Sequence, residues 1–274
     1  MNVAAPELPA TEERLIGQLT QGPVSRVVLS RPEKRNSLSR AMMSALNESL
    51  SRAADDPAVR VVVIAAEGPV FSAGHDLKEL TAHRTDPDGG RSFFAATMDQ
   101  CAQLMLAIVH HPKPVVAEVA GLATAAGCQL VASCDLAIAC EEARFQTPGV
   151  HIGLFCSTPM VALSRSVARK HALEMLLTGD MVPAERAAEI GLINRVTTRE
   201  DLTSETMALA ARIAEKSPLT LKIGKETFQA QLDMPLADAY RHAAEVMVEN
   251  MLTGDAGEGI GAFLGKRTPT WTGR

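Results

Sequence analysis

The feature that most constrains the fold of this chain is the segment VRVVVIAAEG (Val59–Gly68), which is apolar almost throughout. A strand of this kind is typical of a parallel sheet that is covered on both faces, because neither side of the strand can face water. Three further segments have a similar apolar or β-branched character: 24–30, 115–121 and 134–139. Helical periodicity occupies the intervening segments 39–54, 94–110 and 125–132. This alternation predicts an α/β fold with crossover connections between parallel strands.

The pattern changes near Val196. From Asp201 onward the sequence contains no convincing strand, and four segments have helical character: 202–216, 219–232, 235–252 and 258–265. We therefore expect a core at 1–200, with a polar N-terminal arm at about 1–22, and a C-terminal helical region at 201–274. Helices collected at the end of an α/β chain are expected to pack on a neighbour or on another subunit.

Composition excludes several classes of function. The formal net charge is −5, which argues against a nucleic-acid partner because such proteins need a basic surface. A small anionic ligand needs only a local basic cluster and stays compatible. Five cysteines without a Cys-x-x-Cys pair indicate reduced thiols rather than a metal site.

The N-terminal sequence bears on location. Its first fifteen residues lack an apolar core and carry Glu7, Glu12 and Glu13, unlike a secretory or organelle leader. No apolar run approaches the length of a membrane span. We therefore expect a cytoplasmic protein with no membrane partner.

Two glycine-containing turns carry the chemical signal. FSAGHDLKEL (71–80) is a loop that enters a helix, with Asp76 able to cap it, and AGLATAAGCQL (120–130) leads from a strand into another helix. Backbone N–H groups at a helix start are free to bind developing negative charge. The small residues also allow close backbone approach. Either turn alone is usually structural, so the pair is the more informative observation.

Further motifs occur in the same order as in a known family. With RPEKRNSLS (31–39), LTGDMVPAERAAEIGLINRV (177–196) and EGIGAFLGKR (258–267), the chain resembles the enoyl-CoA hydratase/isomerase (crotonase) superfamily from Arg31 to Arg267. GLFCSTP (153–159) looks like its enoyl-CoA hydratase domain-containing protein 3 branch. The resemblance implies a crotonase-like spiral of strand–strand–helix repeats with a C-terminal helical oligomerisation region. It also implies an acyl-CoA thioester as substrate, a homotrimer or dimer of trimers, and no metal or separate cofactor.

The same resemblance assigns roles to individual positions. The backbone amides of His75 and Ala126 match the two donors that hold the thioester oxygen as an oxyanion, and the His75 imidazole can also point at the substrate. Preorganised donors of this kind stabilise an enolate without moving. Other positions match residues that contact coenzyme A, the last two from a neighbouring subunit: Lys34, Arg35, Ala73, Asp76, Leu77, Phe263 and Lys266.

The chain departs from the family at both catalytic glutamates. Gln129 stands at the first position and Gly149 at the second. A carboxamide is not a base near neutral pH and glycine has no side chain, so ordinary hydration of a 2-enoyl-CoA is expected to be slow or absent. Gln129 can still orient a water. His151 and Ser157 are weak candidates for a replacement group.

Three functions stay open at this point. The first is an enoyl-CoA hydratase-like reaction in fatty-acid or acyl-CoA metabolism. The second is a non-catalytic acyl-CoA binder that has kept the pocket. The third is another reaction of the crotonase fold, such as thioester hydrolysis or double-bond isomerisation, performed by His151 or another group.

Overall fold

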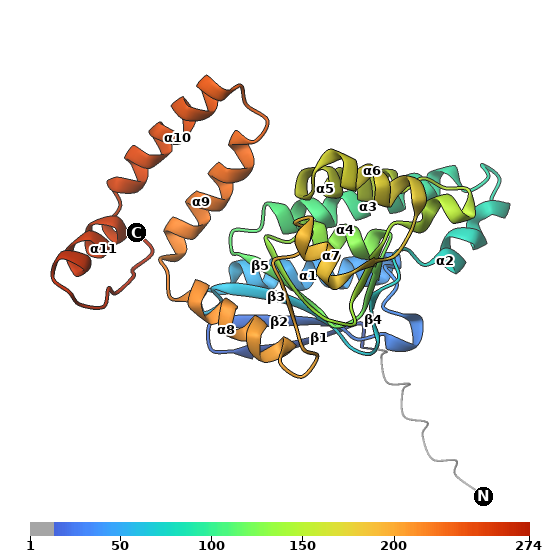
Figure 1. Cartoon of the computed structure of the whole chain (residues 1–274), viewed down its shortest axis with the longest axis horizontal. Coiled ribbons are helices and arrows are strands. Elements are labelled where there is room, and N and C mark those ends of the chain that lie inside the picture. Colours follow the sequence, from blue (N-terminus) through green and yellow to red (C-terminus); the bar gives the residue numbers. More distant parts are fainter. Residues whose placement is uncertain (1–13) are drawn as a thin grey trace, which may run out of the picture.

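The computed structural model describes residues 14–274 and confirms the α/β fold class (Figure 1). One sheet has six strands in the order β1-β2-β3-β5-β7-β10, and a second has four in the order β4-β6-β8-β9. All pairings are parallel except β1 with β2 and β8 with β9. The strands are β1 (Ile16–Gln21), β2 (Val24–Leu29), β3 (Val61–Ala66), β4 (Val70–Ser72), β5 (Val115–Val119), β6 (Leu122–Thr124), β7 (Leu136–Cys140), β8 (Arg144–Gln146), β9 (Val182–Pro183) and β10 (Arg195–Thr197).

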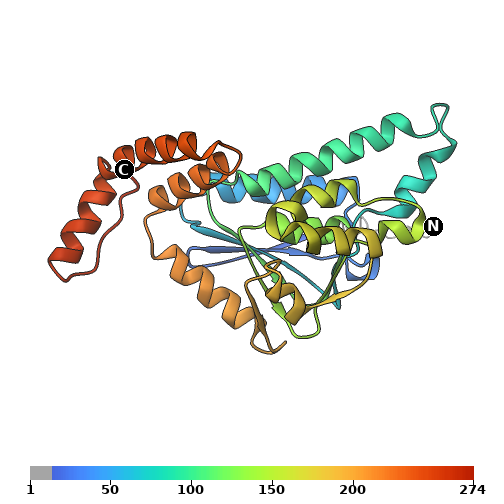
Figure 2. The same cartoon turned by 45° about the horizontal axis from the view of Figure 1, so that its top comes forward.

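Helices cover the six-stranded sheet from both sides, and a helical arm follows (Figures 1 and 2). The α-helices are α1 (Arg40–Asp55), α2 (Leu77–Ala82), α3 (Arg91–Val109), α4 (Ala126–Ser133), α5 (Ser157–Ser166), α6 (Arg169–Thr178), α7 (Ala184–Glu189), α8 (Leu202–Ala214), α9 (Pro218–Gln231), α10 (Leu236–Met251) and α11 (Gly254–Leu264). Three 3₁₀ helices lie in the described part of the chain: η1 (Pro32–Lys34), η2 (His83–Thr85) and η3 (Pro148–Ile152).

The apolar run of β3 is explained by burial on both faces. Val62 and Ile64 belong to the main core, which α1, α3 and α4 cover. Val61 and Val63 point to the opposite face, where they pack with Ala210 of α8 in a second cluster. Alternate side chains of a strand point to opposite faces, so a strand between two helical layers must be apolar at every position.

The edge strand β1 differs from the expected polar arm. Its residues pair antiparallel with β2, from Ile16 opposite Leu29 to Gln21 opposite Val24. Most of its side chains are exposed, so the segment lacks the apolar pattern by which a strand is identified. The four strands of the second sheet are two or three residues long, too short for a periodicity to indicate them. Residues 1–13 of the predicted arm lie outside the described part of the chain.

The C-terminal helices divide into two groups. Residues 201–274 contain no strand, as expected. Helix α8 packs on the sheet, α9 contacts the body through Lys225, whose Nζ lies 2.6 Å from Asp135 Oδ2, and α10 and α11 project away from the body (Figure 2). Helices α9 and α10 bury none of their residues. The boundary between a core at 1–200 and a helical region at 201–274 stays a prediction.

Helix α3 corrects one expectation. It has 19 residues with a mean hydropathy of 1.3, so by length and composition it passes as a membrane span. The prediction that no apolar run approaches that length is therefore wrong. One face of α3 is buried in the main core through Cys101, Leu104 and Ile108. The other apolar side chains of α3, such as Phe93, Phe94 and Leu106, are half-buried or exposed.

A buried ion pair joins the sheet to α8. The guanidinium of Arg26 on β2 donates to both carboxylate oxygens of Glu118 on β5, at 2.6 and 3.2 Å. The hydroxyl of Thr203 on α8 donates to the same carboxylate at 2.9 Å. Glu118 is buried, so its charge depends on these donors.

We expect Arg26→Met to lower the free energy of unfolding by about 3 kcal/mol, because it leaves a buried carboxylate without its cation. The double variant Arg26→Met/Glu118→Leu should recover most of that loss. Urea unfolding at fixed protein concentration measures both effects. Arg186→Met, which breaks an exposed pair with Glu189, is the matched control and should cost less than about 1 kcal/mol. A loss for Arg26→Met no larger than that of the control would contradict the prediction.

Candidate active site

Two backbone turns, each following a strand of the four-stranded sheet, are in direct contact. One follows β4 and the other follows β6. Gly74 in the first has φ +79°, and a Cβ there would lie 2.9 Å from Ala125 Cβ and 3.1 Å from Ala126 N. At Gly127 an added Cβ would lie 2.4 Å from Ser72 O. Only glycine permits this approach, as expected from the small residues in both motifs.

Each turn presents a free backbone amide. His75 lies immediately before the N-cap of α2, and Ala126 is the first residue of α4. Neither N–H donates a hydrogen bond to any residue in 14–274. Buried amides are almost always paired, so two free amides on abutting turns indicate a site for an external acceptor.

The turn before Ala126 is strained. Ala125 has φ 50° and ψ −119°, a conformation that costs a side-chain-bearing residue about 1–3 kcal/mol. Ala125 N still donates to Gln146 O on β8 at 2.9 Å, the last bond of that ladder. The backbone changes direction at Ala125, so the N–H of Ala125 pairs with β8 whereas the N–H of Ala126 does not. Backbone strain of this sort is concentrated at functional sites.

The RPEKRNSLS loop is attached to the first turn. Ala73 N donates to Arg35 O at 3.0 Å, and Leu38 N donates to Gly74 O at 2.7 Å. The predicted coenzyme A residues Lys34 and Arg35 therefore lie next to Ala73, with both side chains exposed.

Asn36 holds this loop and was not among the residues predicted from the sequence. Its buried side chain accepts from Arg31 N at 2.8 Å and donates to Glu67 O and Val70 O at 2.9 and 2.7 Å. Its φ of 48° is left-handed, which asparagine tolerates better than most residues. The sequence shows an asparagine among charged and polar residues, which by itself does not indicate a structural role. Its hydrogen-bond partners Glu67 and Val70 lie some thirty residues away in the chain, so no local pattern predicts them.

Two further predicted contacts lie in the first turn. The carboxylate of Asp76 accepts from Lys78 N at 2.9 Å and Glu79 N at 3.2 Å, so it caps α2. Leu77 is exposed at the start of that helix. By contrast, Phe263 and Lys266 are at and just beyond the C-terminal end of α11, far from α2 (Figure 1). The structure does not bring these two residues to the turns within one chain.

The imidazole of His75 has only one partner. Its Nδ1 lies 3.3 Å from Leu38 O, while Nε2 is buried and has no hydrogen-bond partner among the described residues. Burial lowers the pKa of His75 below its ordinary value, because the charged form loses solvation.

Gln129 points into the core beside α3. Its side chain is 4% exposed, and its Oε1 accepts a weak hydrogen bond from Cys101 Sγ at 3.9 Å. Burial raises the pKa of the Cys101 thiol to about 11 and that of Cys128 to about 12. These thiols are therefore protonated at neutral pH and are poor nucleophiles.

Gly149 is closely packed, so a side chain at this position would press on its neighbours. An added Cβ would lie 3.0 Å from both Cys156 Sγ and Leu154 O, and 3.2 Å from Cys156 N. The space around this position in η3 is occupied by the chain that follows it. A glutamate here would require the 154–156 segment to move.

The two replacement candidates have partners elsewhere. His151 is exposed, and its Nε2 contacts Thr178 O at the end of α6 at 2.9 Å. Ser157 is exposed at the start of α5, with its hydroxyl 3.4 Å from Phe155 O. Neither hydrogen bond involves the two turns.

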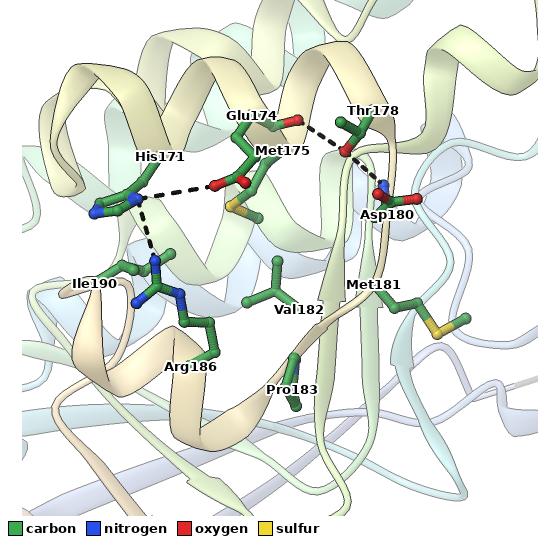
Figure 3. Close-up of a pocket in the computed structure, with 10 residues that line it drawn as sticks. All are labelled: His171, Glu174, Met175, Thr178, Asp180, Met181, Val182, Pro183, Arg186 and Ile190. Carbon is green, nitrogen blue, oxygen red and sulfur yellow. Dashed lines mark hydrogen bonds and ion pairs between the residues drawn. The ribbon is translucent and has the colours of Figure 1, made fainter.

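A separate hollow of about 170 Å³ lies between α6, β9 and α7 (Figure 3). His171, Glu174 and Arg186 form a polar rim, with His171 Nδ1 3.4 Å from the Arg186 guanidinium. Apolar residues such as Val182 and Ile190 line it as well. It contains none of the predicted site residues. No cluster of metal-ligating side chains occurs in residues 14–274.

The fold and the two turns match a known family. The sequence profile of the enoyl-CoA hydratase/isomerase family matches residues 20–274. The chain therefore belongs to this family, which acts on acyl-CoA.

Particular relatives place it more closely. The mitochondrial enoyl-CoA hydratase domain-containing protein 3 of Rattus norvegicus is 47% identical over 269 residues, covering 98% of this chain and 88% of the relative. The crystal structure of the human protein of that name has a TM-score of 0.89 at 46% identity, covering 94% of this chain and 100% of that one. An enoyl-CoA hydratase structure from Mycobacterium smegmatis has the same TM-score and identity, covering 94% of this chain and 99% of that one. The predicted superfamily and its branch are thus confirmed.

The same relatives contradict the expected cytoplasmic location. The rat protein and its counterparts in mouse, frog, human and zebrafish are all named as mitochondrial. The expectation rested on the composition of the first fifteen residues, and a compartment is determined by a sorting signal rather than by the fold.

We expect Gly149→Ala to lower the free energy of unfolding by about 1–3 kcal/mol, because the methyl group overpacks against Leu154 O and Cys156. Adding Cys156→Ala should recover only part of this, since the backbone contacts stay. Gly224→Ala, where an added Cβ meets nothing within 4 Å, is the matched control and should be neutral or stabilising. Thermal unfolding compares the three, and an unchanged melting temperature for Gly149→Ala would show that position 149 accepts a side chain.

Proposed function

We propose that this protein binds acyl-CoA thioesters, with the thioester oxygen held by the N–H groups of His75 and Ala126. The observation that carries the proposal is the pair of unpaired amides on abutting turns, one of them after a strained residue. Negative charge that develops on the oxygen as an enolate forms would be stabilised by donors already in place.

The proposed reaction is enoyl-CoA hydratase-like, through a thioester enolate, and it does not use the usual glutamate pair. At position 129 the amide oxygen of Gln129 faces Cys101, and at position 149 there is no side chain and an added Cβ would lie 3.0 Å from Cys156 Sγ and Leu154 O. Water addition then needs another group to accept the proton, or a substrate that is reactive enough to be hydrated with weaker base catalysis.

The second candidate function is a non-catalytic acyl-CoA binder. The replacement of both glutamates favours it, because the binding groups can be kept without turnover. Thioester hydrolysis through a cysteine nucleophile is disfavoured by the raised pKa values of Cys101, Cys128 and Cys156.

The charges around the first turn support a polyanionic ligand. Lys34 and Arg35 are exposed cations beside Ala73 on a chain whose net charge is −5. A local basic cluster on an acidic protein suits the phosphates of coenzyme A. In this proposal Phe263 and Lys266 complete the site from a second copy of the chain.

The helical arm α9–α11 supports a homotrimer or a dimer of trimers. Its large apolar side chains are exposed in the single chain, with Tyr240 at 73% and Phe263 at 83%. Helices α10 and α11 of the arm are also set apart from the body (Figure 1). An exposed apolar surface of this extent is typical of a protein–protein interface.

The oligomer is tested with Tyr240→Glu. Light scattering of the wild type should give a mass that is a multiple of three chains of 29.1 kDa, and the variant should shift toward one chain. A buried charge without a partner disfavours association. Coenzyme A affinity should fall together with the mass, because Phe263 and Lys266 come from the partner copy. Glu249→Gln, on the exposed surface of the same helix, is the control. A wild-type single chain in solution would refute the proposal.

Turnover is tested by incubating purified protein with a panel of trans-2-enoyl-CoA esters and measuring the gain of one water by mass spectrometry. Ala126→Pro removes one oxyanion donor, so we expect a loss of about 10²–10³ in rate. Proline is tolerated at the first helical position, and circular dichroism checks that the fold survives. Ala126→Gly keeps the N–H and is the matched control.

The outcomes separate the two candidate functions. Hydration by the wild type and by Ala126→Gly, with little by Ala126→Pro, supports the hydratase-like reaction. Binding of the esters without any change in mass supports the binder instead. Equal hydration by the wild type and Ala126→Pro would show that the two amides are not the oxyanion site.

A further inference from the structure

The chain turns back on itself after α11. Lys266 has a φ of 52°, and this left-handed residue reverses the chain at the end of the helix (Figure 1). At the far end of the returning segment, Arg274 O accepts a hydrogen bond from Asp255 N, in the first turn of α11, at 2.9 Å. Residues 267–274 therefore run along the helix from its end back to its first turn. We call this segment the strap.

Asp255 is the main anchor of the strap. It is buried, and its carboxylate accepts from Thr272 N at 2.7 Å and from Gly273 N at 3.1 Å. The hydroxyl of Thr272 donates to the same carboxylate at 3.1 Å. The hydroxyl of Ser217, the N-cap residue of α9, donates to it at 2.6 Å. One buried carboxylate therefore joins α11, the strap and the start of α9.

Two further contacts hold the middle of the strap. The guanidinium of Arg267 donates to both carboxylate oxygens of Glu258 on α11, at 2.6 and 2.7 Å. The indole N–H of Trp271 donates to Glu215 O, at the end of α8, at 2.7 Å. The same ring lies against the backbone of Gly259, where an added Cβ would be 3.1 Å from it. Because α8 packs on the sheet, the strap connects α11 to the body of the protein.

Helix α11 has little apolar packing of its own. It contacts α9 and α10, but only Asp255 and Ala262 among its residues are buried. Its large apolar side chains Ile260, Phe263 and Leu264 are exposed. A helix is normally held in place by an apolar face that packs on its neighbours. The position of α11 in the single chain therefore depends on the hydrogen bonds of the strap.

We propose that the strap fixes α11 so that Phe263 and Lys266 reach the acyl-CoA bound by a second copy of the chain, with Asp255 as the positioning residue. This inference rests on the proposed function, in which these two residues complete a partner's site. Phe263 is in the last turn of α11, and the strap begins directly after Lys266. Release of the strap therefore frees both residues, although Asp255 itself lies at the other end of the helix.

Trp271 reports on the strap without any turnover, because it is the only tryptophan in the chain. Its indole is half-buried and hydrogen-bonded in the wild type. Asp255→Ala should shift the fluorescence emission to longer wavelength and increase quenching by acrylamide, since the released ring enters water. Asp233→Ala, which removes an exposed aspartate between α9 and α10, is the matched control and should leave the spectrum unchanged. Far-UV circular dichroism checks that the protein stays folded.

The effect on the ligand is measured by titrating trans-2-enoyl-CoA esters into each variant. Asp255→Ala should raise the dissociation constant by about tenfold, as expected when a few well-placed contacts are lost. Where an ester is turned over, KM should rise while kcat changes little, because Asp255 acts through binding residues and not on the reacting carbons. Deletion of residues 268–274 removes most of the strap and leaves every residue of α11 in place. It should weaken binding to a similar extent.

A double-mutant cycle separates positioning from a general loss of stability. If Asp255 acts through Phe263 and Lys266, its replacement should cost little further affinity once both are alanine. Phe263→Ala/Lys266→Ala should then bind the esters about as well with Asp255→Ala as without it. Light scattering should give one mass for all variants, because the apolar side chains of α10 are unchanged. Additive losses, or an affinity that falls only together with the mass, would overturn the positioning role.

The outcomes also distinguish this inference from the proposed function. If the wild type binds the esters and Asp255→Ala has the same emission and affinity, the proposed function stands and the strap inference is overturned. A shift in emission without a change in affinity would likewise overturn the delivery of Phe263 and Lys266. If the wild type binds none of the esters, the proposed function fails and the delivery of these residues fails with it.

Discussion

The candidate site depends on how closely two backbone turns approach each other. Gly74 and Gly127 are the positions at which a single added carbon would collide with the opposite turn. Because the turns follow strands β4 and β6, which pair in the same sheet, sheet formation itself brings them together. The N-cap of α2, the start of α4 and the loop that carries Lys34 and Arg35 are all attached to this contact. The two free amides result from the backbone path and not from any side chain.

This arrangement separates charge stabilisation from proton transfer. The amides of His75 and Ala126 are fixed by the fold, so an oxyanion could be bound whatever side chains surround it. Proton transfer instead needs a titratable group in reach, and the two positions that the resemblance assigns to catalytic glutamates carry Gln129 and Gly149. The backbone of Gly149 lies close to Cys156 and Leu154, so a side chain there would need these neighbours to move.

Much of the architecture followed from the sequence. Strand β3 was predicted because burial on both faces requires an apolar side chain at every position, and α1 because Ser39 caps it, accepting from Met42 N at 3.2 Å. Strand β1 and the short strands of the second sheet were not predicted. They are held by hydrogen bonds to distant strands, and their own side chains are too exposed or too few to form a pattern.

The sequence by itself determined the alternation of strands and helices, the glycine-containing turns, and the presence of Gln129 and Gly149 where the resemblance expects glutamates. Each of these depends on residue type and local spacing. Only the tertiary structure decided that Gln129 faces Cys101, that Cys156 lies against Gly149, and that Nε2 of His75 is buried without a partner among the described residues. The physical reason is that the atoms around a side chain belong to elements far away in the chain. A local sequence pattern does not specify which atoms these are.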